Sequence, residues 1–190
     1  MQFCHIPVIL LTAKSNLEDQ IAGIGAGADA YVTKPFNTAY LLQVIETTLI
    51  NREKIKKALT SEGPLNAANT DGLSPQDQAF MKELYKIMDR ELSNDEYNIS
   101  AIVEEMHLSH SKFIYKVKGL TGLTPSEFFK SYKLTKAAEL LRKGEYNISE
   151  VAYMTGFTTL AHFSKVFKKK FGISPSQYLN SDSTSSPKEK

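Results

Sequence analysis

The sequence contains a single cysteine and no apolar run long enough to cross a bilayer. The one thiol, Cys4, excludes an internal disulfide framework and any metal site built on several thiolates. The longest apolar stretch, residues 6–11, contains Pro7, whereas a membrane-spanning helix needs roughly 20 apolar residues. No charged n-region precedes a long apolar segment, as it would in a signal peptide. We therefore expect a reducing, cytoplasmic setting and no membrane contact by this part of the chain.

Metal-ligand spacing is also missing. The histidines show neither an HExxH pattern nor paired ligand spacing, so we expect no structural metal and no cofactor. The composition, with 42% hydrophobic and 23% charged residues, is typical of a globular protein. A length of 190 residues allows one or two domains. The histidines are His5, His107, His110 and His162.

The formal net charge is only +2, but the charges are unevenly distributed. Two stretches, residues 108–126 and 151–177, contain lysines and no acidic residue. Cations clustered without acids suit a phosphate backbone, whereas solvated helix faces usually mix both signs. On charge alone, nucleic-acid binding and a solvated surface are both open.

The chain divides into three parts and a tail. Residues 1–59 alternate short apolar strands with helical patterns, and residues 60–73 are small, polar and contain glycine and proline, as in a linker. Residues 74–180 have helical periodicity nearly throughout. The polar residues 181–190 are expected to be a disordered tail. The predicted fold is mostly α, preceded by a partial α/β segment.

The most informative feature is an internal repeat within residues 98–120 and 147–171. Asn98-Ile99-Ser100 recurs 49 residues later. Phe113, Gly122 and Thr124-Pro125-Ser126 recur after 50 residues, as Phe163, Gly172 and Ser174-Pro175-Ser176. The second copy therefore has one extra residue near the start of its second helix. Each copy is predicted to form a short helix, a tight turn and a longer basic helix, which is the helix-turn-helix pattern. The turn contains Gly156 in one copy and His107 in the other.

A single helix is predicted between the copies, over residues 125–143. Nineteen residues at about 1.5 Å each give roughly 28 Å. Adjacent major grooves on one face of B-DNA lie about 34 Å apart. A rigid spacer of this length could hold one reading helix in each groove.

Residues 156–175 and 109–125, with their matching glycine, aromatic and proline positions, closely resemble the signature of AraC-type transcription regulators. The resemblance covers about residues 78–180 and implies seven helices with two helix-turn-helix units reading adjacent grooves of double-stranded DNA. We also expect RNA polymerase as a candidate partner and a homodimer in the full-length protein. By the resemblance, the base-facing residues are Ser111, Lys112, Ile114, Tyr115, Ala161, His162 and Lys165.

Chemistry supports these assignments and leaves alternatives for some of them. Lysine can donate to guanine acceptors, while alanine and tyrosine can contact a thymine methyl. Ile114 and Tyr115 would serve equally well to seal the helix packing, and a single lysine can simply be solvated. His162 suits DNA contact better than catalysis, because no nucleophile or acid is placed beside it. The expected phosphate contacts are the helix starts Ser109 and Thr158 and the cations Lys116, Lys118, Lys168 and Lys169.

In the first part, residues 6–13 and 30–33 are predicted strands, and Asn37 is expected to cap the helix that follows. Alternating strands and helices indicate a parallel sheet, with Thr12 and Lys34 at its carboxyl edge.

Residues 27–36 closely resemble the last strand of response-regulator receiver domains. That resemblance implies that Thr12 and Lys34 contact a phosphorylated aspartate, that Tyr31 is the aromatic switch and that a cis proline follows the lysine. Only the second half of a receiver is covered, without its phosphoacceptor and acidic Mg²⁺ cluster. We therefore expect a fragment of a hybrid two-component regulator, in which a sensor kinase, a receiver and an AraC-type domain share one chain and the sensor could anchor it in the inner membrane.

Three other functions compete with DNA binding. An enzyme is disfavoured, because the candidate chemistry at Thr12 and Lys34 lacks its aspartate; a histidine kinase would belong to the full-length protein. RNA binding is disfavoured, because the sequence lacks an RRM-like aromatic pair or a GxxG loop. A protein-interaction or dimerisation role of the incomplete receiver, through an exposed apolar edge, is the main alternative.

Overall fold

The computed structural model describes residues 6–13, 16–61, 73–95 and 98–182. Cys4, His5, most of the predicted linker and residues 183–190 of the predicted tail lie outside the described residues. The described elements are β1 (Ile9–Thr12), α1 (Leu17–Gly25), β2 (Ala30–Thr33), α2 (Thr38–Ser61), α3 (Pro75–Arg90), α4 (Ile99–Glu105), α5 (His110–Thr121), α6 (Pro125–Lys143), α7 (Ile148–Met154), α8 (Leu160–Phe171) and α9 (Pro175–Asp182).

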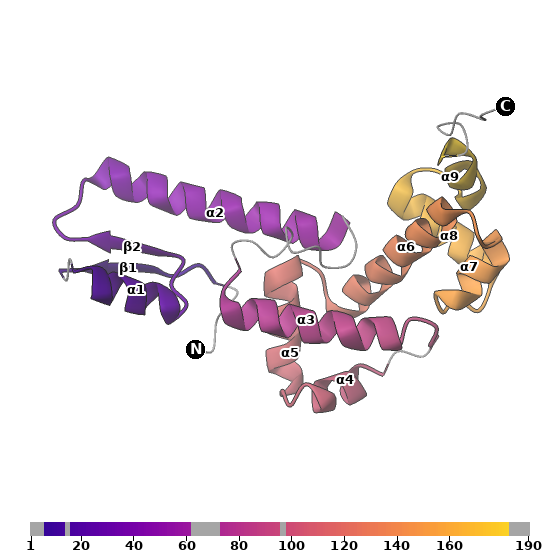
Figure 1. The fold of residues 1–190 in the computed structure, drawn as a ribbon, viewed down its shortest axis with the longest axis horizontal. Helices are drawn as coiled ribbons and strands as arrows, with labels where there is room; N and C mark the ends of the chain where they lie inside the picture. The colour runs from indigo at the N-terminus through magenta and orange to yellow at the C-terminus, as the bar shows by residue number, and fades with distance from the viewer. Residues whose placement is uncertain (1–5, 14–15, 62–72, 96–97, 183–190) are drawn as a thin grey trace.

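The N-terminal part is a small α/β unit. Strands β1 and β2 pair in parallel, with Thr12 opposite Thr33, which confirms the predicted parallel sheet. Helix α1 covers one side of the sheet, and the start of α2 lies on the other (Figure 1). Asn37 accepts a hydrogen bond from the backbone N–H of Ala39 at 2.8 Å and so begins α2, as predicted. This helix continues through Ser61, two residues into the segment predicted to be a linker.

Helices α3 to α9 form the predicted seven-helix region, and α6 joins its two halves. Capping residues define where the helices begin, because a side-chain oxygen at the N-cap accepts a backbone N–H that would otherwise be unsatisfied. Ser74 caps α3 and is followed by Pro75. Thr124 caps α6 and forms a reciprocal capping box with Glu127. Helix α6 spans the 19 residues predicted for the spacer.

Two separate hydrophobic cores lie along α6. In the first core, Phe128 and Tyr132 of α6 pack with residues of α3, α4 and α5. In the second, Leu134 and Leu141 of α6 pack with α7 and α8. One helix therefore contributes to both cores and fixes the two halves relative to each other. Phe113 and Val117 of α5 and Phe163 and Phe167 of α8 are fully buried, while Phe171 is partly buried against the second core.

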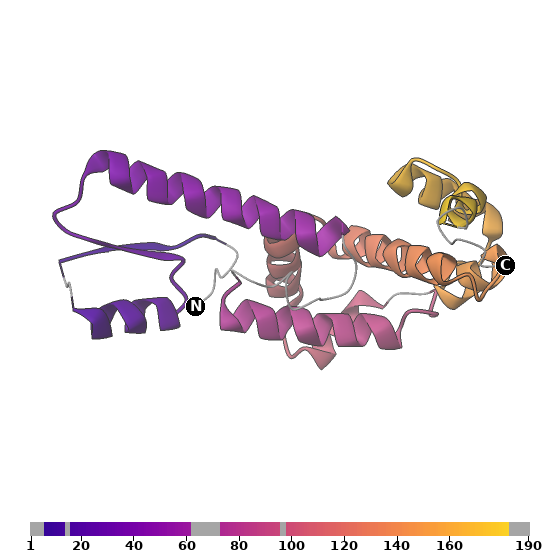
Figure 2. The ribbon, with the colours of Figure 1, turned by 45° about the horizontal axis from the view of Figure 1, so that its top comes forward.

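The C-terminal turns of α2 belong to the first core rather than to the α/β unit. Ile55 and Leu59 are buried there, and the Tyr85 hydroxyl donates to the Leu59 carbonyl at 3.2 Å. In both ribbon views α2 runs from beside the sheet to the beginning of α6 (Figures 1 and 2). The division at residue 59 between the predicted domains is thus bridged by packing that the sequence pattern did not indicate.

Candidate nucleic-acid interface

The repeat seen in the sequence has the same backbone geometry in both copies. Helices α4 and α7 have seven residues each, and α5 and α8 have twelve. The turn between them places His107 at φ 52° in the first copy and Gly156 at φ 69° in the second. Both residues are in the left-handed region, which glycine adopts freely and other residues adopt at a cost. Each copy is therefore a helix-turn-helix unit, as predicted.

Helix α5 begins at the predicted residue. The Ser109 side chain accepts a hydrogen bond from the backbone N–H of Lys112, so Ser109 is the N-cap of α5. On the same helix Phe113 and Val117 are completely buried. The opposite face is exposed, with Ile114 at 41% and Tyr115 at 66% of their maximal accessible surface. These two side chains do not seal the packing, which removes the alternative left open for them.

Helix α8 begins one residue later than predicted. Thr159, not Thr158, accepts the capping hydrogen bond from the backbone N–H of His162. The reason lies in the repeat itself, because the extra residue of the second copy precedes the cap. Thr158 is therefore the residue inserted before the cap, and Thr159 is the equivalent of Ser109. Thr158 is nevertheless exposed beside the helix start.

The exposed face of α8 carries the predicted reading residues of the second unit. Ala161, His162 and Lys165 are exposed, while Phe163 and Phe167 on the opposite face of the helix are fully buried. The His162 ring lies edge-on to Phe157, with 5.9 Å between the ring centroids. In the first unit Ser111 and Lys112 are likewise exposed. Every predicted base-facing residue thus lies on the outer face of its helix.

Lys116 does not have the place predicted for a phosphate-contacting cation. Its ammonium Nζ lies 3.0 Å from Asp77 Oδ1, and its side chain is only 12% exposed. The same ammonium lies over the ring of Phe80, 4.8 Å from the centroid. Asp77 is completely buried at the start of α3, so Lys116 neutralises a buried carboxylate rather than facing a ligand. The sequence showed a basic residue here but not its distant partner.

The other cations predicted to contact phosphates are exposed at the C-terminal turns of the two helices. Lys118 occupies this place on α5, and Lys168 and Lys169 occupy it on α8. Lys170 differs, because its ammonium bonds to the Ser131 carbonyl at 2.6 Å and to the Thr135 hydroxyl at 2.6 Å on α6. Burial lowers the pKa of Lys170 to about 8. Lys170 therefore fastens α8 to α6.

A cleft between the two units adds residues that the sequence did not single out. It is lined by Ser126 and Lys130 of α6 together with Thr158 and His162 of the second unit. Lys130 is exposed and lines the same cleft as Thr158 and His162, two of the predicted DNA contacts. Only its place in the fold distinguishes it, since an isolated lysine in a helix carries no signal.

The N-terminal residues predicted from the receiver resemblance lie at one edge of the small sheet. Thr12 ends β1, and the backbone N–H of Lys34 donates to the Thr12 carbonyl at 2.7 Å. The Lys34–Pro35 peptide bond is cis, as the resemblance implied. Tyr31 lies on β2 opposite Leu10 and is partly buried. The strand ends therefore bring Thr12 and Lys34 together, with Tyr31 two residues before the edge.

Among the residues that the structure describes, no three His, Cys, Asp or Glu side chains gather as a metal site would require. Over the same residues, none of the helices is sufficiently long and apolar to span a membrane.

Comparison with known proteins gives matches to the helical region and to nearly the whole chain. Residues 102–181 match a family described as a helix-turn-helix domain. The transcriptional regulator MtrA of Neisseria gonorrhoeae is 34% identical over 103 residues, which are 54% of this chain and 34% of that protein. A protein named histidine kinase P4, from Formosa agariphila, is 35% identical over 176 residues, which are 93% of this chain and 13% of that protein. The chain thus spans only a minor part of either relative.

A solved structure shares the helical fold. The AraC-type transcriptional regulator from Chromobacterium violaceum superposes with a TM-score of 0.53 at 20% identity, over 58% of this chain and 98% of that one. The fold of the C-terminal region is therefore the AraC-type arrangement of two helix-turn-helix units.

Proposed function

We propose that this chain binds double-stranded DNA in a sequence-specific manner and regulates transcription. The observation that carries the proposal is the duplicated surface: α5 and α8 each bury one apolar face and expose the opposite face. Both exposed faces lie in stretches without an acidic residue. Such a face can approach the phosphate backbone without repulsion.

The spacing of the two helices supports simultaneous binding. Helix α6 contributes to both cores and so fixes one unit relative to the other. Its 19 residues span roughly 28 Å at about 1.5 Å per residue. That length is compatible with two adjacent major grooves. A rigid connection also raises the effective concentration of the second unit once the first has bound.

The contacts divide into two classes. Lys112 in the first turn of α5 and Lys165 in the middle of α8 are proposed to read base edges, as lysine does at guanine acceptors. Lys118 and Lys168, at the C-terminal turns, are proposed to contact phosphates and so to position the helices. The other base-facing candidates are Ser111, Ile114, Tyr115, Ala161 and His162; further phosphate candidates are Ser109, Thr158 and Lys169.

We further propose that the chain is the output part of a two-component phosphorelay protein. Two observations support this: the parallel strands with Thr12 and Lys34 at one edge, and the similarity of 93% of the chain to a part of a protein named histidine kinase. Phosphorylation of the full-length protein should then change its affinity for DNA. An affinity that is equal with and without a phosphodonor would contradict this role.

A second function is favoured by the apolar face of α1. Leu17, Ile21 and Ile24 follow one another at helical spacing and are 70%, 62% and 55% exposed. An apolar stripe of this kind is typical of an interaction surface. Sedimentation of the chain at several concentrations tests dimerisation through it, and a monomer at all concentrations would rule it out.

The primary proposal is tested by selecting duplexes from a random pool with the whole chain. We expect an enriched site with two halves about 10–10.5 base pairs apart, one for each reading helix. Binding to that site should weaken steeply as salt rises, because counterions are released from the phosphates. A pool without enrichment, combined with no binding at low ionic strength, would refute the proposal.

A further inference from the structure

A chain of charges connects the N-terminal sheet with the first reading helix. Asp29, just before β2, accepts the Val8 backbone N–H on Oδ2 at 2.8 Å and Arg52 Nη2 on Oδ1 at 2.6 Å. Arg52 of α2 lies 4.0 Å from Asp77 Oδ2 on α3. Asp77 in turn pairs with Lys116 of α5 at 3.0 Å. The signs alternate along the chain, so its four charged side chains balance.

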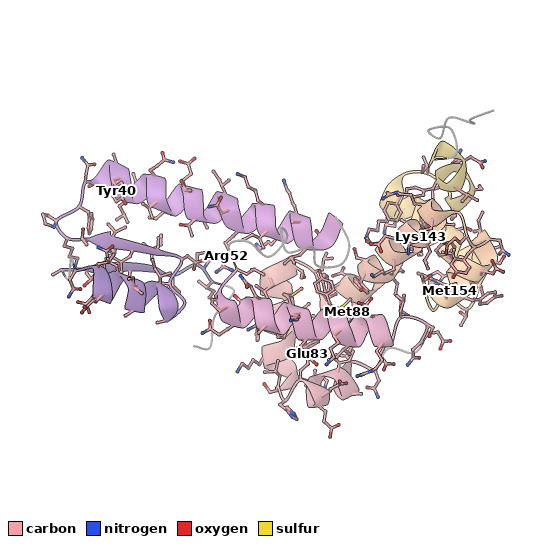
Figure 3. All side chains as sticks on the ribbon, viewed as in Figure 1. Tyr40, Arg52, Glu83, Met88, Lys143 and Met154 are labelled. Atoms are coloured by element: carbon pink, nitrogen blue, oxygen red, sulfur yellow. The ribbon has the colours of Figure 1, made fainter. Side chains whose placement is uncertain are left out.

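The four charged side chains of this series are shielded from water. The side chains of Asp29, Arg52, Asp77 and Lys116 are 13%, 10%, 0% and 12% exposed. Charges shielded from water are screened little by salt, and separating one buried partner leaves another without compensation. Helix α2 therefore cannot move away from α3 and α5 without a large cost. Arg52 lies between α2 and the first turn of α3 (Figure 3).

A second connection leads from the end of the same helix to the second reading helix. The Ser131 hydroxyl of α6 donates to the Thr60 carbonyl of α2 at 3.5 Å. The same hydroxyl accepts from Lys170 Nζ of α8 at 2.7 Å. Thr60 is eight residues after Arg52, or about 12 Å along the helix. Helix α2 thus has one polar connection to α5 and another, through α6, to α8.

From these two connections we infer that α2 is a clamp that sets the relative placement of the two reading helices. Displacement of α2 by the α/β unit is passed to α5 through Asp77 and to α8 through Ser131. The inference rests on the proposed function for its consequence, which is that the state of the N-terminal unit regulates the spacing of the two DNA contacts. The physical warrant is a rigid element in contact with both sites.

The clamp is tested in the whole chain without DNA first. Spin labels on His110→Cys and Leu160→Cys, the first residues of α5 and α8, in a Cys4→Ser background report the distance between the helices. Arg52→Gln should broaden or shift that distance distribution. Lys54→Gln, at an exposed position on the same helix, is the matched control and should leave it unchanged. If Arg52→Gln prevents folding, Ser131→Ala tests the other connection at a partly exposed site and should move the distribution as well.

Binding then separates the clamp from the proposed function. With a duplex selected by the unmodified chain, Arg52→Gln or Ser131→Ala should lower affinity for the two-half site by roughly tenfold or more. Affinity for a duplex with one half scrambled should stay within about twofold, because each unit still binds alone. Identical distance distributions in the variants and the Lys54→Gln control would overturn the clamp. If the distance responds but no variant or parent binds duplex, the clamp stands and the proposed function fails.

Discussion

The turn of the second helix-turn-helix unit offers a sharp test of how the two units are held together. Gly156 has φ 69°, and a Cβ placed there would lie 2.8 Å from the Leu92 carbonyl oxygen, 2.9 Å from the Asn94 carbonyl oxygen and 2.5 Å from Lys133 Nζ. Two of these three neighbours are backbone atoms of the segment that follows α3, in the first half of the helical region. Gly156→Ala therefore forces the second unit away from this segment, or distorts the turn.

Two terms contribute to the expected loss in the free energy of unfolding of Gly156→Ala. An alanine in the left-handed region costs about 1 kcal/mol, and crowding against backbone atoms adds roughly 1–3 kcal/mol. Gly144→Ala separates the terms, because Gly144 has the same φ of 69° with no atom within 4 Å of the added Cβ. We expect a loss in the free energy of unfolding of about 2–4 kcal/mol for Gly156→Ala and about 1 kcal/mol for Gly144→Ala.

Equilibrium denaturation in urea measures both losses under one protocol. Equal losses for the two substitutions would show that the backbone atoms are not in contact with the turn, and would refute the reasoning. His107→Gly, at the equivalent turn with φ 52°, should instead be neutral or slightly stabilising, since it relieves the same strain.

Three further predictions concern individual lysines. Lys165→Ala should relax the preference at one base pair of a selected site, whereas Lys168→Ala should weaken binding to all duplexes similarly. Competition with single-base variants of the site distinguishes the two effects. Equal specificity profiles for the two substitutions would contradict the proposal that one lysine reads a base and the other contacts a phosphate. Lys118→Met should reduce the slope of log affinity against log salt by about 1, with little change in stability. Lys116→Met should leave that slope unchanged and lower the free energy of unfolding by roughly 3–5 kcal/mol, because its carboxylate partner stays buried. The opposite pattern would restore the phosphate role of Lys116. Burial lowers the pKa of Lys170 to about 8, so between about pH 8 and the ordinary lysine range the unfolded chain binds more protons than the folded chain, and stability should rise with pH there. The free energy of unfolding of Lys170→Met should lack this rise. A parallel rise in both proteins would contradict the prediction.

Much of the helical region was predictable because its signals are local. Caps such as Ser109 and Thr124, each followed by a regular apolar pattern, determine where helices begin. The repeat also predicted two like units and an extra residue in the second. Its position relative to the cap was not predicted, because Thr158 and Thr159 are equally good caps in isolation. Only the offset of 50 residues, applied from Ser109, distinguishes them.

The contacts that the sequence did not reveal are all long-range. Asp77 lies in the first turn of α3, where acidic residues are favourable at the surface. In the structure it is fully buried and neutralised by Lys116 and Arg52, which are 39 and 25 residues away in the chain. Helical periodicity gives no information about such partners. The same limit explains why the end of α2 was assigned to a different domain from the core in which Ile55 and Leu59 are buried.

A groove-resolved footprint of the whole chain on a selected duplex tests the central claim most directly. Methylation protection and hydroxyl-radical cleavage on both strands should show two protected major-groove segments on one side of the helix, about one turn apart. Substitution of Lys112 should then expose only one segment, and substitution of Lys165 only the other. Protection confined to a single major groove, or to minor-groove positions, would contradict an account in which α5 and α8 read the same duplex together.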